Sequence, residues 1–261
     1  MLNLKRIQIA VFVVFAAMTV FLFVPQDGAN EARQALADKG AAAYDSGDYQ
    51  AAAKAFEDAA RQAPADGHLY FNLGLTHLKA GKIGEAMGAL LTARRLLPRD
   101  PDVDAALRYG TGKLKDKLSP NMAPGALESV LGWLRQFTAR ELAFGSALLA
   151  LIVAFVASLT LTVPKWRPAH LGSLALLILP VLGVGATFWR YDQDELWGAV
   201  RPASAKVFAG PTTKQSVLFE LQEGAPFVVT QGARDGFLSI ALSDGKKGWI
   251  SGTDVSVYGL D

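Results

Sequence analysis

The sequence predicts a multidomain membrane protein that combines an all-α helical-repeat domain, transmembrane helices and a small all-β barrel. Three observations support this prediction. A pattern of glycine, alanine and proline within residues 31–118 recurs once at a fixed offset. Long uncharged apolar segments follow it, as membrane helices require. Residues 196–261 then change to short alternating strands separated by turn residues.

The repeated pattern has an offset of 34 positions, the length of a helix–turn–helix repeat unit. Glycine and alanine let the two helices of a unit approach each other, and we expect a larger apolar side chain to fill the remaining gap. Turn glycines accept the left-handed conformation that ends a helix, and prolines close each unit because they cannot continue a helix. The matched positions are Gly40, Gly47, Ala52, Phe56, Ala59 and Pro64, then Gly74, Gly81, Ala86, Leu90, Ala93 and Pro98.

These positions resemble the tetratricopeptide repeat, over about residues 31–100. Residues 101–118 are predicted to form one further amphipathic helix, which caps the array. The resemblance implies that a peptide or helix binds in the concave groove lined by the first helix of each unit. Alternatively, the apolar groove positions are partly buried by the neighbouring repeat or by the cap. The groove candidates are Tyr44, His68, Phe71, Leu75, Leu78 and Lys79.

Residues 1–30 predict a signal anchor or a signal peptide. Lys5 and Arg6 precede an apolar run, residues 7–24, that is long enough to cross a hydrocarbon core. No small-x-small cleavage site follows this run, which favours the uncleaved anchor. The basic start keeps the N-terminus in the cytoplasm, so we expect the repeat domain outside it.

Residues 119–141 predict a linker and then an amphipathic helix along the membrane surface, unless that helix merely extends the following span. Residues 142–190 predict a transmembrane helical hairpin, because two apolar segments, 142–163 and 170–189, flank a short basic loop at 164–168. The charge of a short loop sets membrane orientation, so we expect this loop in the cytoplasm. A positive mean hydropathy also indicates a membrane protein.

The strands expected in residues 196–261 cover 207–208, 217–221, 226–230, 237–242 and 248–250. Their order resembles a bacterial SH3-like domain, carried by Val207, Gly210, Pro211, Leu221, Gly224, Val228, Val229, Phe237, Asp244, Gly245, Gly248, Trp249 and Ile250. The resemblance implies a small barrel that binds wall peptides or short protein segments, or serves as a spacer. The candidate surface residues are Phe208, Phe237 and Trp249, although a core position for Trp249 is the favoured alternative. Lys246 and Lys247 are expected at a solvated hairpin tip.

The composition argues against an enzyme. The chain has no cysteine, which excludes thiolate chemistry, and no P-loop, dinucleotide or hydrolase motif. Its three histidines, His68, His77 and His170, do not form a metal-ligand pattern. We therefore expect no catalytic residue, no cofactor and no metal. A net charge of +2 without a basic stripe argues against a nucleic-acid partner.

The combination of repeats, membrane hairpin and SH3-like domain resembles the BatE-type proteins of the bacterial aerotolerance operon. The resemblance implies a scaffold in the bacterial inner membrane, with both soluble domains extracytoplasmic. Its implied partners are membrane-anchored von Willebrand A-domain proteins and a MoxR-type AAA+ ATPase. The alternative is a peptidoglycan-binding module that recruits wall hydrolases. A third hypothesis, an accessory to envelope maturation, has no haem-handling motif to support it.

Overall fold

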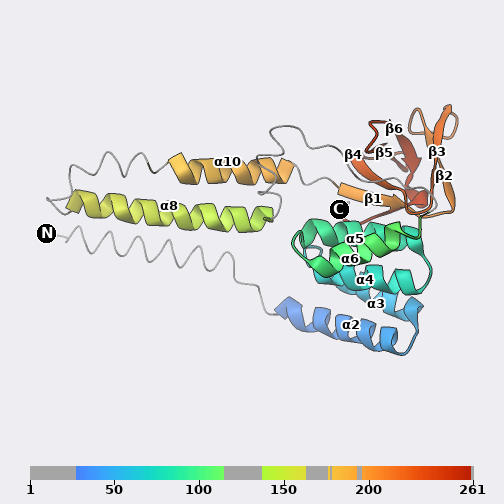
Figure 1. The fold of residues 1–261 in the computed structure, drawn as a ribbon, viewed down its shortest axis with the longest axis horizontal. Coiled ribbons are helices and arrows are strands. Elements are labelled where there is room, and N and C mark those ends of the chain that lie inside the picture. The colour runs from blue at the N-terminus through green and yellow to red at the C-terminus, as the bar shows by residue number, and fades with distance from the viewer. Residues whose placement is uncertain (1–27, 115–136, 163–175, 177, 193–195, 260–261) are drawn as a thin grey trace. The chain divides into compact units, whose positions relative to one another are not determined.

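The computed structural model describes residues 28–114, 137–162, 176, 178–192 and 196–259 (Figure 1). The chain divides into two compact units, described separately below. One unit contains an N-terminal helical repeat region and a C-terminal seven-strand antiparallel sheet. The other contains two helices from the segment between them. The predicted leader at 7–24, the amphipathic helix before residue 137 and the loop at 164–168 lie outside the described residues.

The repeat region consists of helices in which each packs against the next. Aspartate side chains cap three of them: Asp48, Asp66 and Asp100 each accept a main-chain N–H in the first turn. The turn glycines, Gly47 and Gly81, have φ of 82° and 75°, as the repeat pattern predicts. The helices are α2 (Gly28–Asp45), α3 (Tyr49–Gln62), α4 (Gly67–Lys79), α5 (Ile83–Leu96) and α6 (Pro101–Thr111).

The mid-helix glycines have the role that the sequence predicts. A Cβ placed on Gly40 would lie 2.9 Å from the ring of Phe56, and one on Gly74 would lie 2.6 Å from Cγ of Leu90. Each glycine therefore admits the large apolar side chain of the partner helix. Phe56 and Leu90 are accordingly buried in the core of the repeat region.

The capping helix α6 ends earlier than predicted, at Thr111 rather than 118, and residues 115–118 lie outside the described residues. Val103 and Leu107 are buried in the repeat core and attach α6 to the array. Asp100 and Pro101 begin the helix, as a capping residue and a first-turn proline commonly do.

The C-terminal sheet has the strand order β3-β2-β6-β5-β4-β1-β7, and every neighbouring pair is antiparallel. Its core contains Val200, Val207, Phe227, Ile240 and Ile250. The five predicted strands are confirmed as β2 to β6, and the sequence prediction missed β1 and β7. The strands are β1 (Leu196–Val200), β2 (Ser204–Phe208), β3 (Val217–Gln222), β4 (Pro226–Arg234), β5 (Phe237–Ala241), β6 (Lys247–Ser251) and β7 (Val255–Val257).

The two missed strands are those that pack against α5. Gly84 and Gly88 lie one turn apart on the same side of this helix. A Cβ on Gly84 would lie 2.3 Å from the carbonyl oxygen of Val200, and one on Gly88 would lie 2.5 Å from that of Ser256. The absence of side chains at these positions therefore brings the helix into direct contact with the backbone of the sheet.

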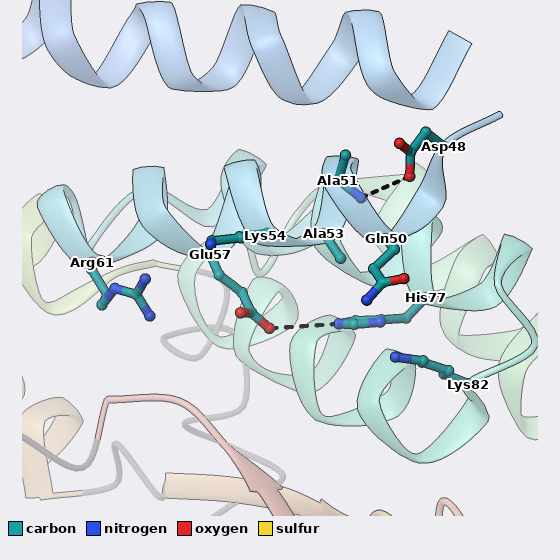
Figure 2. A pocket seen from close by; sticks show the side chains of 9 residues that line it. All are labelled: Asp48, Gln50, Ala51, Ala53, Lys54, Glu57, Arg61, His77 and Lys82. Carbon is teal, nitrogen blue, oxygen red and sulfur yellow. Dashed lines mark hydrogen bonds and ion pairs between the residues drawn. The ribbon is translucent and has the colours of Figure 1, made fainter. Parts of the chain in front are cut away.

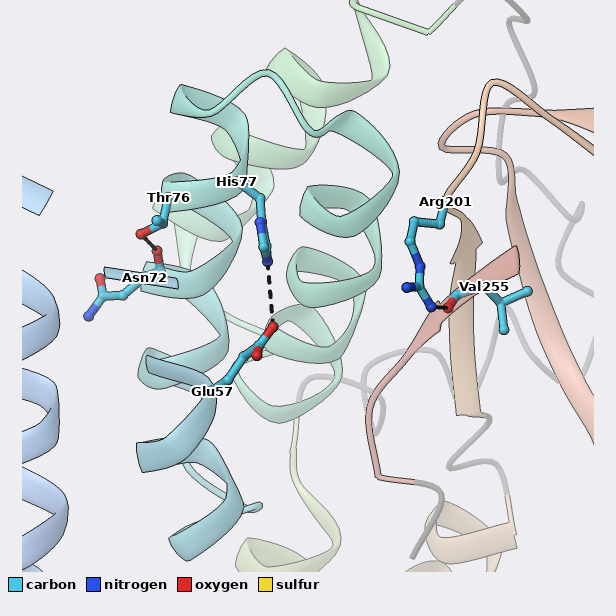
Figure 3. Close-up of polar contacts among 6 residues, drawn as sticks. All are labelled: Glu57, Asn72, Thr76, His77, Arg201 and Val255. Carbon is cyan, nitrogen blue, oxygen red and sulfur yellow. Dashed lines mark hydrogen bonds and ion pairs between the residues drawn. The ribbon is translucent and has the colours of Figure 1, made fainter. Parts of the chain in front are cut away.

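Polar and aromatic contacts also join the helices to the sheet and connect residues within it. The N–H of Gly84 donates to Oε1 of Glu223 at 3.2 Å, at a helix start where Lys82 supplies no side-chain cap. The Tyr258 ring lies 5.5 Å from that of Tyr70 on α4, and burial raises the pKa of Tyr258 to about 12. Within the sheet, the Arg201 guanidinium donates to the Val255 carbonyl at 2.8 Å (Figure 3).

The second unit contains α8 (Ala139–Thr162) and α10 (Ile178–Asp192), which pack against each other. A Cβ on Gly183 would lie 2.8 Å from Cβ of Ser146, so this glycine lets the two helices approach closely. The helices overlap the apolar segments predicted at 142–163 and 170–189. In the described parts of the chain, none of the helices is both long enough and apolar enough to cross a membrane, so the two predicted spans are not confirmed there.

Candidate functional site

The predicted groove candidates lie on α2 and α4, which are the first helices of the two repeats. His68 and Lys79 are exposed, whereas Phe71 and Leu75 are half-buried against the repeat core. Tyr44 is also half-buried, and its ring meets the ring of Tyr49 edge-on at 5.5 Å. The predicted alternative of partial burial therefore holds for the apolar groove positions, which still expose part of their surface.

Leu78 shows how the capping helix contributes to this burial. Its Cδ2 atom lies 3.8 Å from the point where a Cβ on Gly110 would stand. Leu78 is therefore packed beside α6, with Met87 of α5 on the same side. The cap therefore covers part of this groove candidate.

The sequence prediction did not name Tyr109, an exposed residue of the capping helix that is equivalent to a groove candidate. Tyr109 is 58% exposed, which is unusual for a large aromatic side chain, and Nζ of Lys113 lies 5.3 Å from its ring centroid. It stands 34 positions after Leu75 and so occupies the same repeat position. The offset of 34 positions therefore contains a signal for this residue, although Arg108 stands where the repeat has its glycine.

The charges along the first helices are unevenly placed. Lys79 at the end of α4 and Lys113 just after α6 occupy corresponding repeat positions, and both side chains are exposed. The equivalent position on α2 is Asp45. The first-helix face can therefore contact apolar side chains through Leu75 and Tyr109, and an acidic group through the two lysines.

The predicted surface residues of the sheet do not form one exposed patch. Phe208 is buried at 9% exposure, which corrects its prediction as a surface residue. The cause is its position in the sheet, where it pairs in register with Trp249 and its ring contacts that of Phe237 edge-on at 5.9 Å. Phe237 and Trp249 are half-buried, so Trp249 does not lie fully in the core. Lys246 lies at the exposed tip, paired with Asp244 at 2.8 Å.

A second feature is a hollow of about 570 Å³ between α3 and the end of α4 (Figure 2). His77 borders it, and the two ring nitrogens of His77 have no hydrogen-bond partner. The pKa of His77 is lowered to about 4, mainly because the ring is buried and secondly because of the positive charge of Lys82. His68 lies exposed at the other end of α4, and no group of three or more potential metal ligands occurs in the parts of the chain that the structure describes.

Comparison with known proteins agrees with the helical geometry. No curated protein matches this chain. Residues 37–102 match the family model of the tetratricopeptide repeat, which covers the second part of α2 through the start of α6. The chain therefore contains a tetratricopeptide-repeat region, followed by a seven-strand antiparallel sheet.

Proposed function

We propose that this protein is a non-enzymatic scaffold whose tetratricopeptide groove binds a segment of a partner protein. The match to the repeat family suggests protein–protein interaction in general. The observation that carries the proposal is the exposed Tyr109, at the repeat position that Leu75 occupies in the preceding unit. Aromatic side chains that remain exposed are common anchors of protein interfaces.

The sheet packs on α5, which is the second helix of its unit. The groove candidates His68 and Lys79, together with Tyr109, remain exposed in the presence of this packing. A partner segment with an apolar side chain beside an acidic one fits these groups, because the ammonium group of Lys113 lies over the Tyr109 ring. The groove is short, so a second contact elsewhere would raise the affinity.

The test is a crosslinked affinity pull-down of the tagged full-length protein from detergent-solubilised membranes, with identification of the recovered proteins. Tyr109→Ser should reduce recovery of the partner about tenfold, as expected for an interface anchor worth somewhat more than 1 kcal/mol. Tyr109→Phe keeps the ring and should keep the partner. Phe71→Ala with Leu75→Ala should also reduce recovery. Unchanged recovery with Tyr109→Ser at wild-type abundance would count against the groove.

We further propose that the scaffold is anchored in the bacterial inner membrane through residues 142–190, with its repeat and sheet domains extracytoplasmic. The support comes from the sequence, in which segments 142–163 and 170–189 carry almost no charge around a basic loop. Von Willebrand A-domain proteins and a MoxR-type AAA+ ATPase are the partners proposed by resemblance. Release of the protein by alkaline carbonate, or full protection of the repeats from protease added to spheroplasts, would argue against this arrangement.

A second candidate function is binding to peptidoglycan through the SH3-like sheet. The half-buried Trp249 and Phe237 favour it, because both still present aromatic surface on the sheet. The full-length protein in detergent should then co-sediment with purified wall material, and Trp249→Ala should release it. Recovery of wall hydrolases alone in the pull-down would support this candidate over the groove.

A further inference from the structure

His77 is a buried polar residue without a hydrogen bond. It lies near the end of α4 at 4% exposure, and neither ring nitrogen has a partner. Two other buried polar side chains of this region are satisfied: Thr76 donates to the Asn72 carbonyl at 2.7 Å (Figure 3), and Thr92 donates to that of Gly88 at 3.0 Å. An unsatisfied buried ring costs free energy, so its retention here requires an explanation.

The ring borders the hollow of about 570 Å³ whose wall consists mainly of long polar side chains from α3 (Figure 2). The groove, in contrast, is lined by the first helices of each unit. Lys54 and Lys82 on this wall are exposed, so they can change rotamer without moving a helix. The lining residues are Asp48, Gln50, Ala51, Ala53, Lys54, Glu57, Arg61, His77 and Lys82.

The charged groups of the hollow differ in whether they already have partners. Asp48 accepts the N–H of Ala51 at 3.0 Å, and the Arg61 guanidinium pairs with Asp58. Glu57 places Oε1 4.0 Å from Nε2 of His77, which is too long for a hydrogen bond.

Lys54 and Lys82 have no carboxylate within ion-pair distance among the described residues. The lining of the hollow thus carries three cationic side chains, Lys54, Arg61 and Lys82, and two carboxylates, Asp48 and Glu57. The surplus charge is positive.

We propose that this hollow binds a carboxylate group, with Lys54 and Lys82 as its cationic contacts and the N–H of His77 as its buried donor. Charge-assisted hydrogen bonds of this kind are stronger than neutral ones. The carboxylate belongs either to an acidic segment of a protein or to a small dicarboxylate, since both present the same chemistry. This site lies apart from the proposed groove and goes beyond the proposed function.

Occupation of the hollow should change the charge of His77. The charged groups that line the hollow with the ring are Asp48, Glu57 and Arg61 together with the two lysines. A bound carboxylate would offset the field of Lys82 and stabilise the imidazolium, which raises the pKa of His77 from about 4. Binding should therefore take up a proton and strengthen as the pH falls from 7 toward 5.5.

The test uses the full-length protein labelled with ¹³C and ¹⁵N in histidine, because the chain has only three histidines. The resonances are assigned with His68→Gln and His170→Gln. The probes are succinate and an acetylated peptide of four glutamates, and succinamide is the uncharged control. We expect the His77 ring resonances to move with an acidic probe, and their titration to shift toward neutral pH. A response to the peptide alone assigns a protein source, whereas a response to succinate assigns a small dicarboxylate.

Lys82→Met and Lys54→Met should each weaken the response about tenfold, the effect of losing one charge-assisted contact. Lys39→Met, which removes an exposed lysine on α2, is the matched control and should leave the response unchanged. Tyr109→Ser should also leave it unchanged, so the result is independent of the groove. A His77 ring that ignores both acids, or that responds equally to succinamide, would overturn the proposal.

Discussion

Lowering the pH should destabilise the repeat region through His77. The folded protein keeps this imidazole neutral, with a pKa of about 4, whereas an unfolded histidine titrates near 6.5. The unfolded chain therefore takes up a proton as the pH falls below 6.5, and the folded chain does so only near 4. His77 therefore leaves the unfolding free energy unchanged above pH 6.5 and lowers it progressively as the pH falls from 6.5 to 4.

The size of the loss follows from the separation of the two pKa values. At pH 5 the unfolded histidine is almost fully protonated and the folded one is not, which costs about 2 kcal/mol relative to pH 7.5. The loss reaches about 3 kcal/mol near pH 4. Burial is the main cause of the low pKa of His77, and the charge of Lys82 adds to it.

The assay is urea unfolding of the full-length protein, followed by far-ultraviolet circular dichroism between pH 7.5 and 5. His77→Gln cannot titrate, so its unfolding free energy should rise by about 2 kcal/mol relative to wild type over this range. The difference between the proteins removes the contribution of other titrating groups. His68→Gln, a histidine exposed on the same helix, should keep the wild-type pH dependence. Parallel curves for wild type and His77→Gln would refute the reasoning.

Three further predictions concern the contacts between the helical repeats and the C-terminal region. Gly88→Val should lower the unfolding free energy by about 3 kcal/mol, because even a Cβ at this position would lie 2.5 Å from the backbone of β7. Gly232→Ala should have little effect, because a Cβ there would have no atom within 4 Å. Glu223→Gln should cost about 1 kcal/mol in urea unfolding because it weakens the cap of α5, whereas Glu220→Gln on exposed β3 should cost less. An ultraviolet absorbance titration should show one tyrosine that ionises only near pH 12, and Tyr258→Phe should remove that step; its persistence would assign the shift elsewhere.

The repeat could be predicted from the sequence because its constraints are local and periodic. Gly40 and Gly74 stand at positions where a side chain would displace Phe56 and Leu90, so the requirement appears at the same offset in both units. The turn glycines need positive φ for the same local reason. The exposed Tyr109, which the sequence prediction did not name, follows the same period but stands one residue after a position that lacks the expected glycine.

The packing of the sheet on α5 could not be predicted in this way. Gly84 and Gly88 interrupt an ordinary helix, and their partners in β1 and β7 lie more than 100 positions later in the sequence. β7 has only three residues, too few for alternation to identify it. The orphaned ring of His77 depends equally on tertiary burial, because nothing in the neighbouring sequence distinguishes a histidine without a partner from a satisfied one.

The contact between α5 and the sheet also joins two parts of the chain that are far apart in the sequence. The described chain leaves this unit at Leu114 and returns to it at Leu196, so the intervening segment is an insertion whose two ends are fixed to the same body. Because β1 and β7 pack on α5, this unit needs the chain on both sides of the insertion, and neither part alone covers the face that the other buries.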